Sequence, residues 1–110
     1  MVTPGQPGSL TASRITTWPG GIVAEIVTDE QACAFARWSQ GGSWSGWWPI
    51  ADGVRDVSLV AADGEQEPTA LVSIVQWTQV PPSPMAARHH KPYKQAFYRL
   101  TASGVVPADL

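Results

Sequence analysis

Glycine and proline contribute ten residues each to a chain of 110, and they separate short runs of β-branched and aromatic residues. Such frequent turn residues leave no segment long enough for a helical bundle or a coiled coil. Hydrophobic residues make up 44% of the chain, which is enough for one modest core and leaves no room for a second domain. We therefore expect a single compact domain.

Four of these runs have the pattern of strands. Residues 10–18 and 22–27 are rich in Thr, Ile and Val and flank a Pro-Gly-Gly sequence, which predicts two strands around a turn. Residues 54–61 alternate between apolar and polar side chains, and residues 69–80 are apolar on both faces. The latter pattern predicts the central strand of a sheet.

The remaining runs are more ambiguous. Residues 43–50 are interrupted by a glycine and a proline, so they fit an edge strand or a loop. Residues 93–101 fit both alternation and helical spacing, and we favour a last strand. Residues 1–9 are rich in Gly, Ser and Pro and are expected to form an extended arm, and residues 105–110 a C-terminal tail.

One segment favours a helix. Thr28 and Gln31 stand at the two ends of a capping-box pattern, with Thr28 as the N-cap. Apolar residues then follow at helical spacing, among them Ala32, Phe35 and Ala36, before two glycines that would end the helix. The predicted fold is therefore α+β.

The predicted domain covers residues 10–104. It consists of an antiparallel sheet of about five strands with one helix packed on a face. The order of the strands is not specified by these patterns. The sequence has no internal repeat of the length found in solenoids or propeller blades.

Tryptophan is concentrated in one short stretch. Trp38, Trp44, Trp47 and Trp48 lie within eleven residues, among glycines and serines. Trp38 and the more distant Trp77 are expected in the core. In a strand, Trp44 and Trp48 would share one face and Trp47 would lie on the other. Since exposed aromatic rings are typical of protein-binding hot spots, we predict that Trp44, Trp47 and Trp48 bind a partner, with sugar rings as the alternative ligand.

The second feature is a basic segment. Residues 1–70 carry eight acidic and three basic side chains, whereas the segment from Arg88 to Arg99 has no acid. The partner-binding candidates in it are Arg88, His89, His90, Lys91, Tyr93 and Lys94. These side chains suit an acidic protein surface or the phosphates and bases of nucleic acid. The net charge of −2 favours the first, because nucleic-acid binders usually carry a positive field.

Catalytic and metal-binding roles have little support. Side chains of adjacent residues such as His89 and His90 usually point in different directions. No third residue that could bind a metal stands at a suitable spacing from them. Cys33 is the one cysteine, which excludes an internal disulfide. No neighbour of Cys33 in the sequence would lower its pKa. We therefore expect no catalytic residue, no metal site and no cofactor.

The sequence thus favours a non-catalytic protein-binding or assembly module, which binds a protein partner or further copies of itself. A carbohydrate-binding module and a small nucleic-acid-binding protein that uses residues 88–99 are the alternatives. The composition, without asparagine and with more arginine than lysine, is typical of a high-GC bacterium or its phage. No stretch resembles a membrane span or a secretion signal, so the cytoplasm or a phage particle is the expected location.

Overall fold

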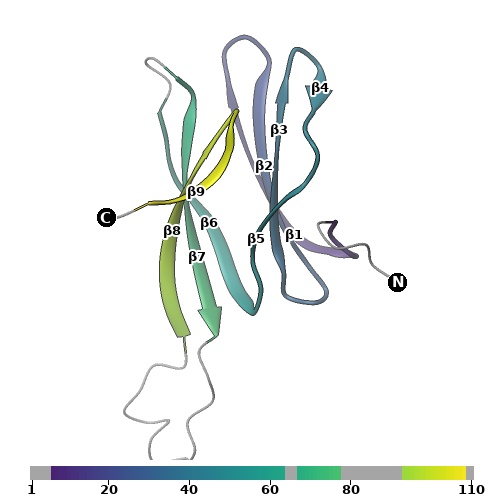
Figure 1. The fold of residues 1–110 in the computed structure, drawn as a ribbon, viewed down its shortest axis with the longest axis vertical. Helices are drawn as coiled ribbons and strands as arrows, with labels where there is room; N and C mark the ends of the chain where they lie inside the picture. The colour runs from purple at the N-terminus through teal and green to yellow at the C-terminus, as the bar shows by residue number, and fades with distance from the viewer. Residues whose placement is uncertain (1–5, 64–66, 78–92, 109–110) are drawn as a thin grey trace, which may run out of the picture.

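Two antiparallel sheets form the part of the chain that the computed structural model describes, residues 6–63, 67–77 and 93–108 (Figure 1). Sheet A contains β1 (Leu10–Trp18), β2 (Ile22–Asp29), β3 (Ala34–Gln40), β4 (Ser43–Trp44) and β5 (Trp48–Ala51). Sheet B contains β6 (Val54–Asp63), β7 (Thr69–Trp77), β8 (Tyr93–Thr101) and β9 (Gly104–Ala108). The sheets lie face to face as a two-layer sandwich.

Each sheet is built from one continuous part of the chain. Sheet A has the order β1-β2-β3-β4, with β5 also paired to β3, and sheet B has the order β6-β7-β8-β9. The chain passes from one sheet to the other once, through Asp52 and Gly53. The carbonyls of these two residues accept hydrogen bonds from Gln76 Nε2 (2.9 Å) and from the backbone N–H of Trp77 (2.8 Å). The connection is therefore fixed to the end of β7.

Alternation along the strands places one set of side chains between the sheets. Sheet A contributes small residues such as Ala24 and Ala36, which allow the sheets to approach closely. Sheet B contributes larger aliphatic residues, namely Val57, Val72, Ile74 and Leu100. Trp18 and Trp38 add bulk on the sheet A side, with ring centroids 5.2 Å apart. The prediction that Trp38 belongs to the core is confirmed, since it is buried.

The predicted α+β fold, one sheet of about five strands with a helix on a face, is wrong, because the described residues contain no helix and form two antiparallel sheets. Strand β2 continues to Asp29, and residues 34–40 form β3. Between them the carboxylate of Asp29 accepts hydrogen bonds from the backbone N–H groups of Gln31 and Cys33, both at 3.0 Å. Ala32 adopts a positive φ of 61°. The presumed capping box is therefore a tight turn organised by an aspartate side chain.

The alternation of β3 explains why it was mistaken for a helix. Ala34, Ala36 and Trp38 face the core, whereas Phe35 and Arg37 lie on the outer face. Alanine is small enough for either environment and is a strong helix former. The apolar positions therefore match helical spacing and strand spacing equally well, and the pairing with β2 decides between them.

The other strand predictions are confirmed within the described residues. Strand β7 lies between β6 and β8 and is apolar on both faces, as expected of a central strand. Residues 78–80 of the predicted strand lie outside the described residues. Strand β9 uses residues that were assigned to a C-terminal tail.

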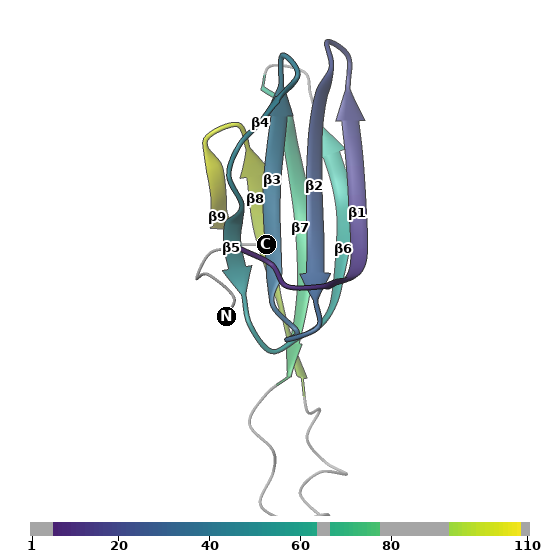
Figure 2. The same cartoon turned by 90° about the vertical axis from the view of Figure 1, so that its right-hand side faces the viewer.

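The described part of the N-terminal arm, residues 6–9, runs across the outer face of sheet A (Figure 2). The backbone N–H of Gly8 donates to the Asp29 carboxylate (2.9 Å), and that of Glu30 donates to the Ser9 carbonyl (2.8 Å). The outward-facing Val27 and Phe35 are buried. This part of the arm is thus packed on its own domain.

Candidate functional site

Exposed aromatic rings occur on the outer faces of both sheets, and an arginine accompanies each group. On sheet A, Arg37 lies against Trp44 and Trp47 and pairs with Glu25. We call these four residues the Arg37 cluster. On sheet B, Arg55 lies over Trp77 and Tyr93. We call these three residues the Arg55 cluster.

The Arg37 cluster is tightly connected. The guanidinium carbon of Arg37 is 3.9 Å from the ring centroid of Trp44 and 4.5 Å from that of Trp47. Its Nε donates to Glu25 Oε1 at 2.7 Å, and Ser13 Oγ donates to Glu25 Oε2 at 3.0 Å. Glu25 is only 8% exposed, so the ion pair is shielded on the carboxylate side. A buried carboxylate without a cation or hydrogen-bond donor would destabilise the fold, so Glu25 depends on Arg37 and Ser13 in this position.

The strand is interrupted between the two rings of the Arg37 cluster, at residues 45–47. Ser45 Oγ accepts a hydrogen bond from the backbone N–H of Trp38 (2.9 Å), and the backbone N–H of Ser45 donates to the Trp38 carbonyl (2.7 Å). The hydroxyl of Ser45 thereby takes the place of a backbone carbonyl as the acceptor for β3. As a result, side chains between Trp44 and Trp48 no longer alternate regularly between the two faces of the sheet. Trp47 therefore joins Trp44 on the outer face, where the sequence placed it opposite Trp44.

Trp48 occupies the other side of sheet A. It pairs with Ala36 in the register of β5 and packs against the core between the sheets. Of the three tryptophans predicted to bind a partner, Trp44 is the most exposed, at 43%, and Trp47 and Trp48 are half-buried. The structure brings Trp44 and Trp47 together and directs Trp48 away from them.

The Arg55 cluster is open to solvent. Trp77 and Tyr93 are direct cross-strand neighbours at the ends of β7 and β8 and are 53% and 36% exposed. The guanidinium carbon of Arg55 is 5.5 Å from the Trp77 centroid and 5.0 Å from the Tyr93 centroid. A bulge in the pairing of β6 with β7 falls at Arg55. Bulges commonly redirect a side chain at the edge of a sheet.

The Arg55 cluster continues into an apolar surface on sheet B. Leu71, Val75 and Trp77 share the outer side of β7, opposite to the buried Val72 and Ile74. Outward residues of the neighbouring strands include Phe97 and the exposed Val106. Leu71, Val75 and Phe97 remain partly accessible. We call this surface the outer face of sheet B.

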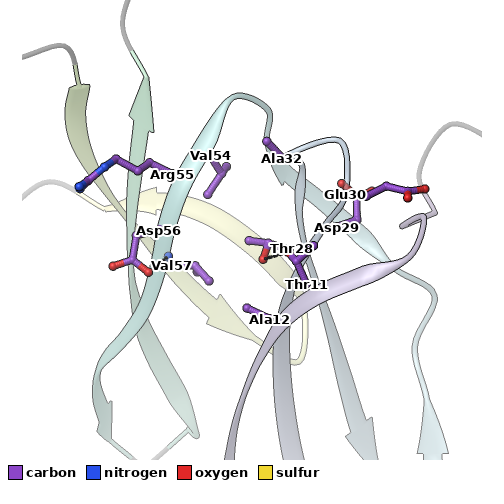
Figure 3. A pocket seen from close by; sticks show the side chains of 10 residues that line it. All are labelled: Thr11, Ala12, Thr28, Asp29, Glu30, Ala32, Val54, Arg55, Asp56 and Val57. Carbon is purple, nitrogen blue, oxygen red and sulfur yellow. Dashed lines mark hydrogen bonds between the residues drawn. The ribbon is translucent and has the colours of Figure 1, made fainter.

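Some polar side chains on the outer face of sheet B form hydrogen bonds with each other. Ser73 is buried in the middle of β7, and its hydroxyl accepts a hydrogen bond from Gln95 Nε2 at 2.7 Å. Arg99 stands on the same side of β8, and Arg55 and Asp56 lie on β6. Figure 3 shows the side chains of Arg55 and Asp56 pointing away from sheet A. The face thus combines an apolar centre with charged residues around it.

Two of the basic-segment candidates lie in a described strand. Tyr93 belongs to the Arg55 cluster, and Lys94 is exposed at the next position of β8, which alternates to the other side. Arg88, His89, His90 and Lys91 lie outside the described residues. Their predicted role in partner binding therefore stays a prediction.

Sequence reasoning missed the most exposed aromatic residue of sheet B. Trp77 was expected in the core, and this expectation is wrong. The signal was present in the alternation of β7, because Trp77 shares its parity with Leu71 and Val75 and not with Val72 and Ile74. Arg55 and Arg37 were also missed, since no spacing in the sequence shows which rings they contact.

A cavity of about 250 Å³ lies between the end of β2, the start of β1 and the start of β6 (Figure 3). Ala12, Val54 and Val57 contribute apolar side chains to it. The hydroxyls of Thr11 and Thr28 lie 3.0 Å apart and hydrogen-bond to each other. Its lining carboxylate Asp29 is occupied by backbone donors.

Two titratable groups near this cavity, Asp29 and Cys33, belong to the turn between β2 and β3. Burial would raise the pKa of Asp29, but the backbone N–H groups of Gly8, Cys33 and Gln31 outweigh it and hold the pKa below its usual value. Burial, with the charges of Asp29 and Asp52, raises the pKa of the Cys33 thiol. That thiol is therefore protonated at neutral pH and a poor nucleophile. Among the described residues, no three His, Cys, Asp or Glu side chains gather as metal ligands.

Comparison with known proteins adds no relative. No protein-family model matches the chain, and searches of curated proteins and of solved structures find no match. In residues 6–63, 67–77 and 93–108, there is also no helix with the length and apolarity needed to cross a membrane.

Proposed function

We propose that this chain is a non-catalytic protein-binding or assembly module that docks through the outer face of sheet B. The observation that supports this is the outward side of β7, where an internal strand presents Leu71, Val75 and Trp77 away from the core. An outer strand face usually carries polar residues. Apolar residues that stay accessible after the domain has packed favour an interface with another molecule.

The chemistry of the Arg55 cluster supports the same proposal. Tryptophan, tyrosine and arginine are the residues most enriched in protein-binding hot spots. Here the three are adjacent and accessible, and the rings are held by the ladder between β7 and β8. A ring held by a strand loses little conformational entropy when a partner covers it. A place in the cytoplasm or in a phage particle remains part of this proposal.

A photo-crosslinking experiment tests the proposed face. In a Cys33→Ala background, Val75→Cys places a benzophenone label on the outer face of sheet B, and Thr17→Cys places the same label on the outer face of sheet A. We expect the label at position 75, and not the label at position 17, to form one defined adduct in an extract of the source cells. Mass spectrometry then identifies the protein in the adduct, which includes the chain itself as a candidate.

Other outcomes would redirect the proposal. Equal labelling from both positions, or none from position 75, would contradict docking through sheet B. The carbohydrate and nucleic-acid alternatives are tested with the unmodified protein. Saccharide binding that depends on Trp44 would favour the first. Oligonucleotide binding that weakens steeply with salt would favour the second, since Arg55, Arg99 and the rings of this face would then contact phosphates and bases.

A further inference from the structure

The outer face of sheet B has the dimensions of one half of a small symmetric interface. Three of its four strands have nine or ten residues. With strands about 4.8 Å apart and each about 30 Å long, the face measures roughly 500 Å². Two such faces in contact would bury roughly 1,000 Å² in total, which is the lower bound for a specific protein interface.

The shape of this face favours an identical partner. A sheet is twisted, and two sheets pack well when their twists match, with their strands within about 30° of each other. Two copies of sheet B have the same twist by definition. The outward rows of the two copies can then interdigitate as the inner rows of sheets A and B do in the core.

The polar groups of the face also suit burial against a copy of itself. Ser73 and Gln95 hydrogen-bond to each other within the face, so covering them leaves fewer polar groups without a partner. Arg55 stands beside Asp56 on β6, so each face presents both a cation and an anion to its mate. The net charge of −2 per chain is small, so repulsion between copies is weak.

From the area, the twist and the presence of charges of both signs, we infer that the partner is a second copy of this chain, bound symmetrically with the outer faces of the two B sheets in contact. This inference rests on the proposed function. The centre of the interface consists of Val75 and Phe97, and Trp77 and Tyr93 lie at its end. Sheet A, with the Arg37 cluster, faces solvent on both sides of the dimer.

The solution mass of the purified full-length chain tests this inference. We expect light scattering and sedimentation to show a monomer–dimer equilibrium over a wide dilution range, changed little by salt. Trp77→Ser should raise the dimer dissociation constant by at least about thirtyfold, because it removes a hot-spot ring. Val75→Asp should have a similar effect by placing two like charges in the interface.

Trp44→Ser is the matched control, because Trp44 is a comparably exposed tryptophan on the outer face of sheet A. It should leave the dissociation constant unchanged, and circular dichroism should show that all three variants are folded. A wild-type chain that is monomeric at every concentration would overturn the self-pairing. So would a dimer that Trp77→Ser and Val75→Asp do not weaken.

This experiment separates the inference from the proposal on which it rests. If the chain is monomeric but the label at position 75 crosslinks to a different protein, docking through sheet B stands and the identity of the partner is wrong. If neither a dimer nor an adduct forms, both are wrong.

Discussion

Arg37 and Arg55 each lie against two aromatic rings, yet their surroundings differ. Arg37 is ion-paired to a nearly buried glutamate and contacts Trp44 at 3.9 Å. Arg55 is exposed, and its rings stand at 5.0 Å and 5.5 Å. An arginine with a buried acid behind it is part of the fold, whereas one that lies over accessible rings adds little to stability and remains available to a partner.

The largest expected difference between the clusters is in stability. Arg37→Met should lower the free energy of unfolding by about 2 kcal/mol, because it leaves Glu25 buried without its cation. Arg55→Met is the matched variant and should change it by less than about 0.5 kcal/mol. Urea unfolding at a fixed protein concentration measures both. Equal losses in the two variants would contradict the distinction.

The turn that aligns Glu25 with Arg37 should show the next largest effect, and it should depend on pH. The pKa of Asp29 is lowered in the fold. The ionised carboxylate therefore contributes fully to the free energy of unfolding at any pH above the usual aspartate pKa of about 4. This stabilisation is lost as the pH falls through the lowered pKa of the folded state. Asp29→Asn should cost about 1 kcal/mol at pH 7 and should remove this part of the acid sensitivity.

The control for the pH effect is Gln31→Ala, which alters the same turn but keeps its backbone N–H donor to Asp29. Unfolding curves between pH 2 and 7 should retain the acid-dependent loss in this variant. If Asp29→Asn and the wild type lost stability in parallel over that range, the hydrogen bonds to the carboxylate would not be its source.

Part of this architecture could be predicted from the sequence. Strands appear where β-branched runs end at glycine or proline turns, as in residues 10–18 and 22–27, and β7 is central because both of its faces are apolar. The turn at Asp29 could not be separated from a helix that starts at Thr28, because short polar side chains accept backbone hydrogen bonds both at a helix N-cap and in a turn.

For the candidate site, the sequence predicts which types of residue take part but not which of them lie side by side. An accumulation of tryptophans indicates aromatic contacts, but the break in the strand at residues 45–47, where Ser45 bonds to Trp38, changes which rings share a face. Likewise, Trp77 and Tyr93 are sixteen positions apart and become neighbours through the register of β7 with β8. Such contacts depend on pairing between distant segments, which local patterns do not specify.

Double-mutant cycles would sharpen the comparison further. In the Arg37 cluster, the cost of Trp44→Ala should fall by about 1 kcal/mol once Arg37→Met is present, because the cation–π contact is already lost. In the Arg55 cluster, the coupling between Trp77→Ala and Arg55→Met should stay below about 0.5 kcal/mol. Chemical unfolding of the four variants in each cycle gives these values, and a larger coupling at Arg55 would reverse the comparison.

The smallest effect should come from the turn that leads into β3. Ala32 adopts a positive φ of 61°, which costs an alanine more than a glycine. Ala32→Gly should therefore raise the free energy of unfolding by about 0.5 kcal/mol, after the greater entropy of the unfolded glycine is subtracted. A lower melting temperature in this variant would show that the turn is relaxed with alanine.

The division of the chain into two continuous sheets has a consequence for how it folds. Strand pairing within each sheet joins neighbours in sequence, apart from the return of β5 to β3. Most ladders therefore need only short loop closures, and the longest, between β7 and β8, spans residues 78–92. The contacts between Ala24 or Ala36 and sheet B span much longer stretches of chain. We expect the two sheets to form early as separate meanders and to dock late, with substitutions in the shared core acting mainly on the unfolding rate.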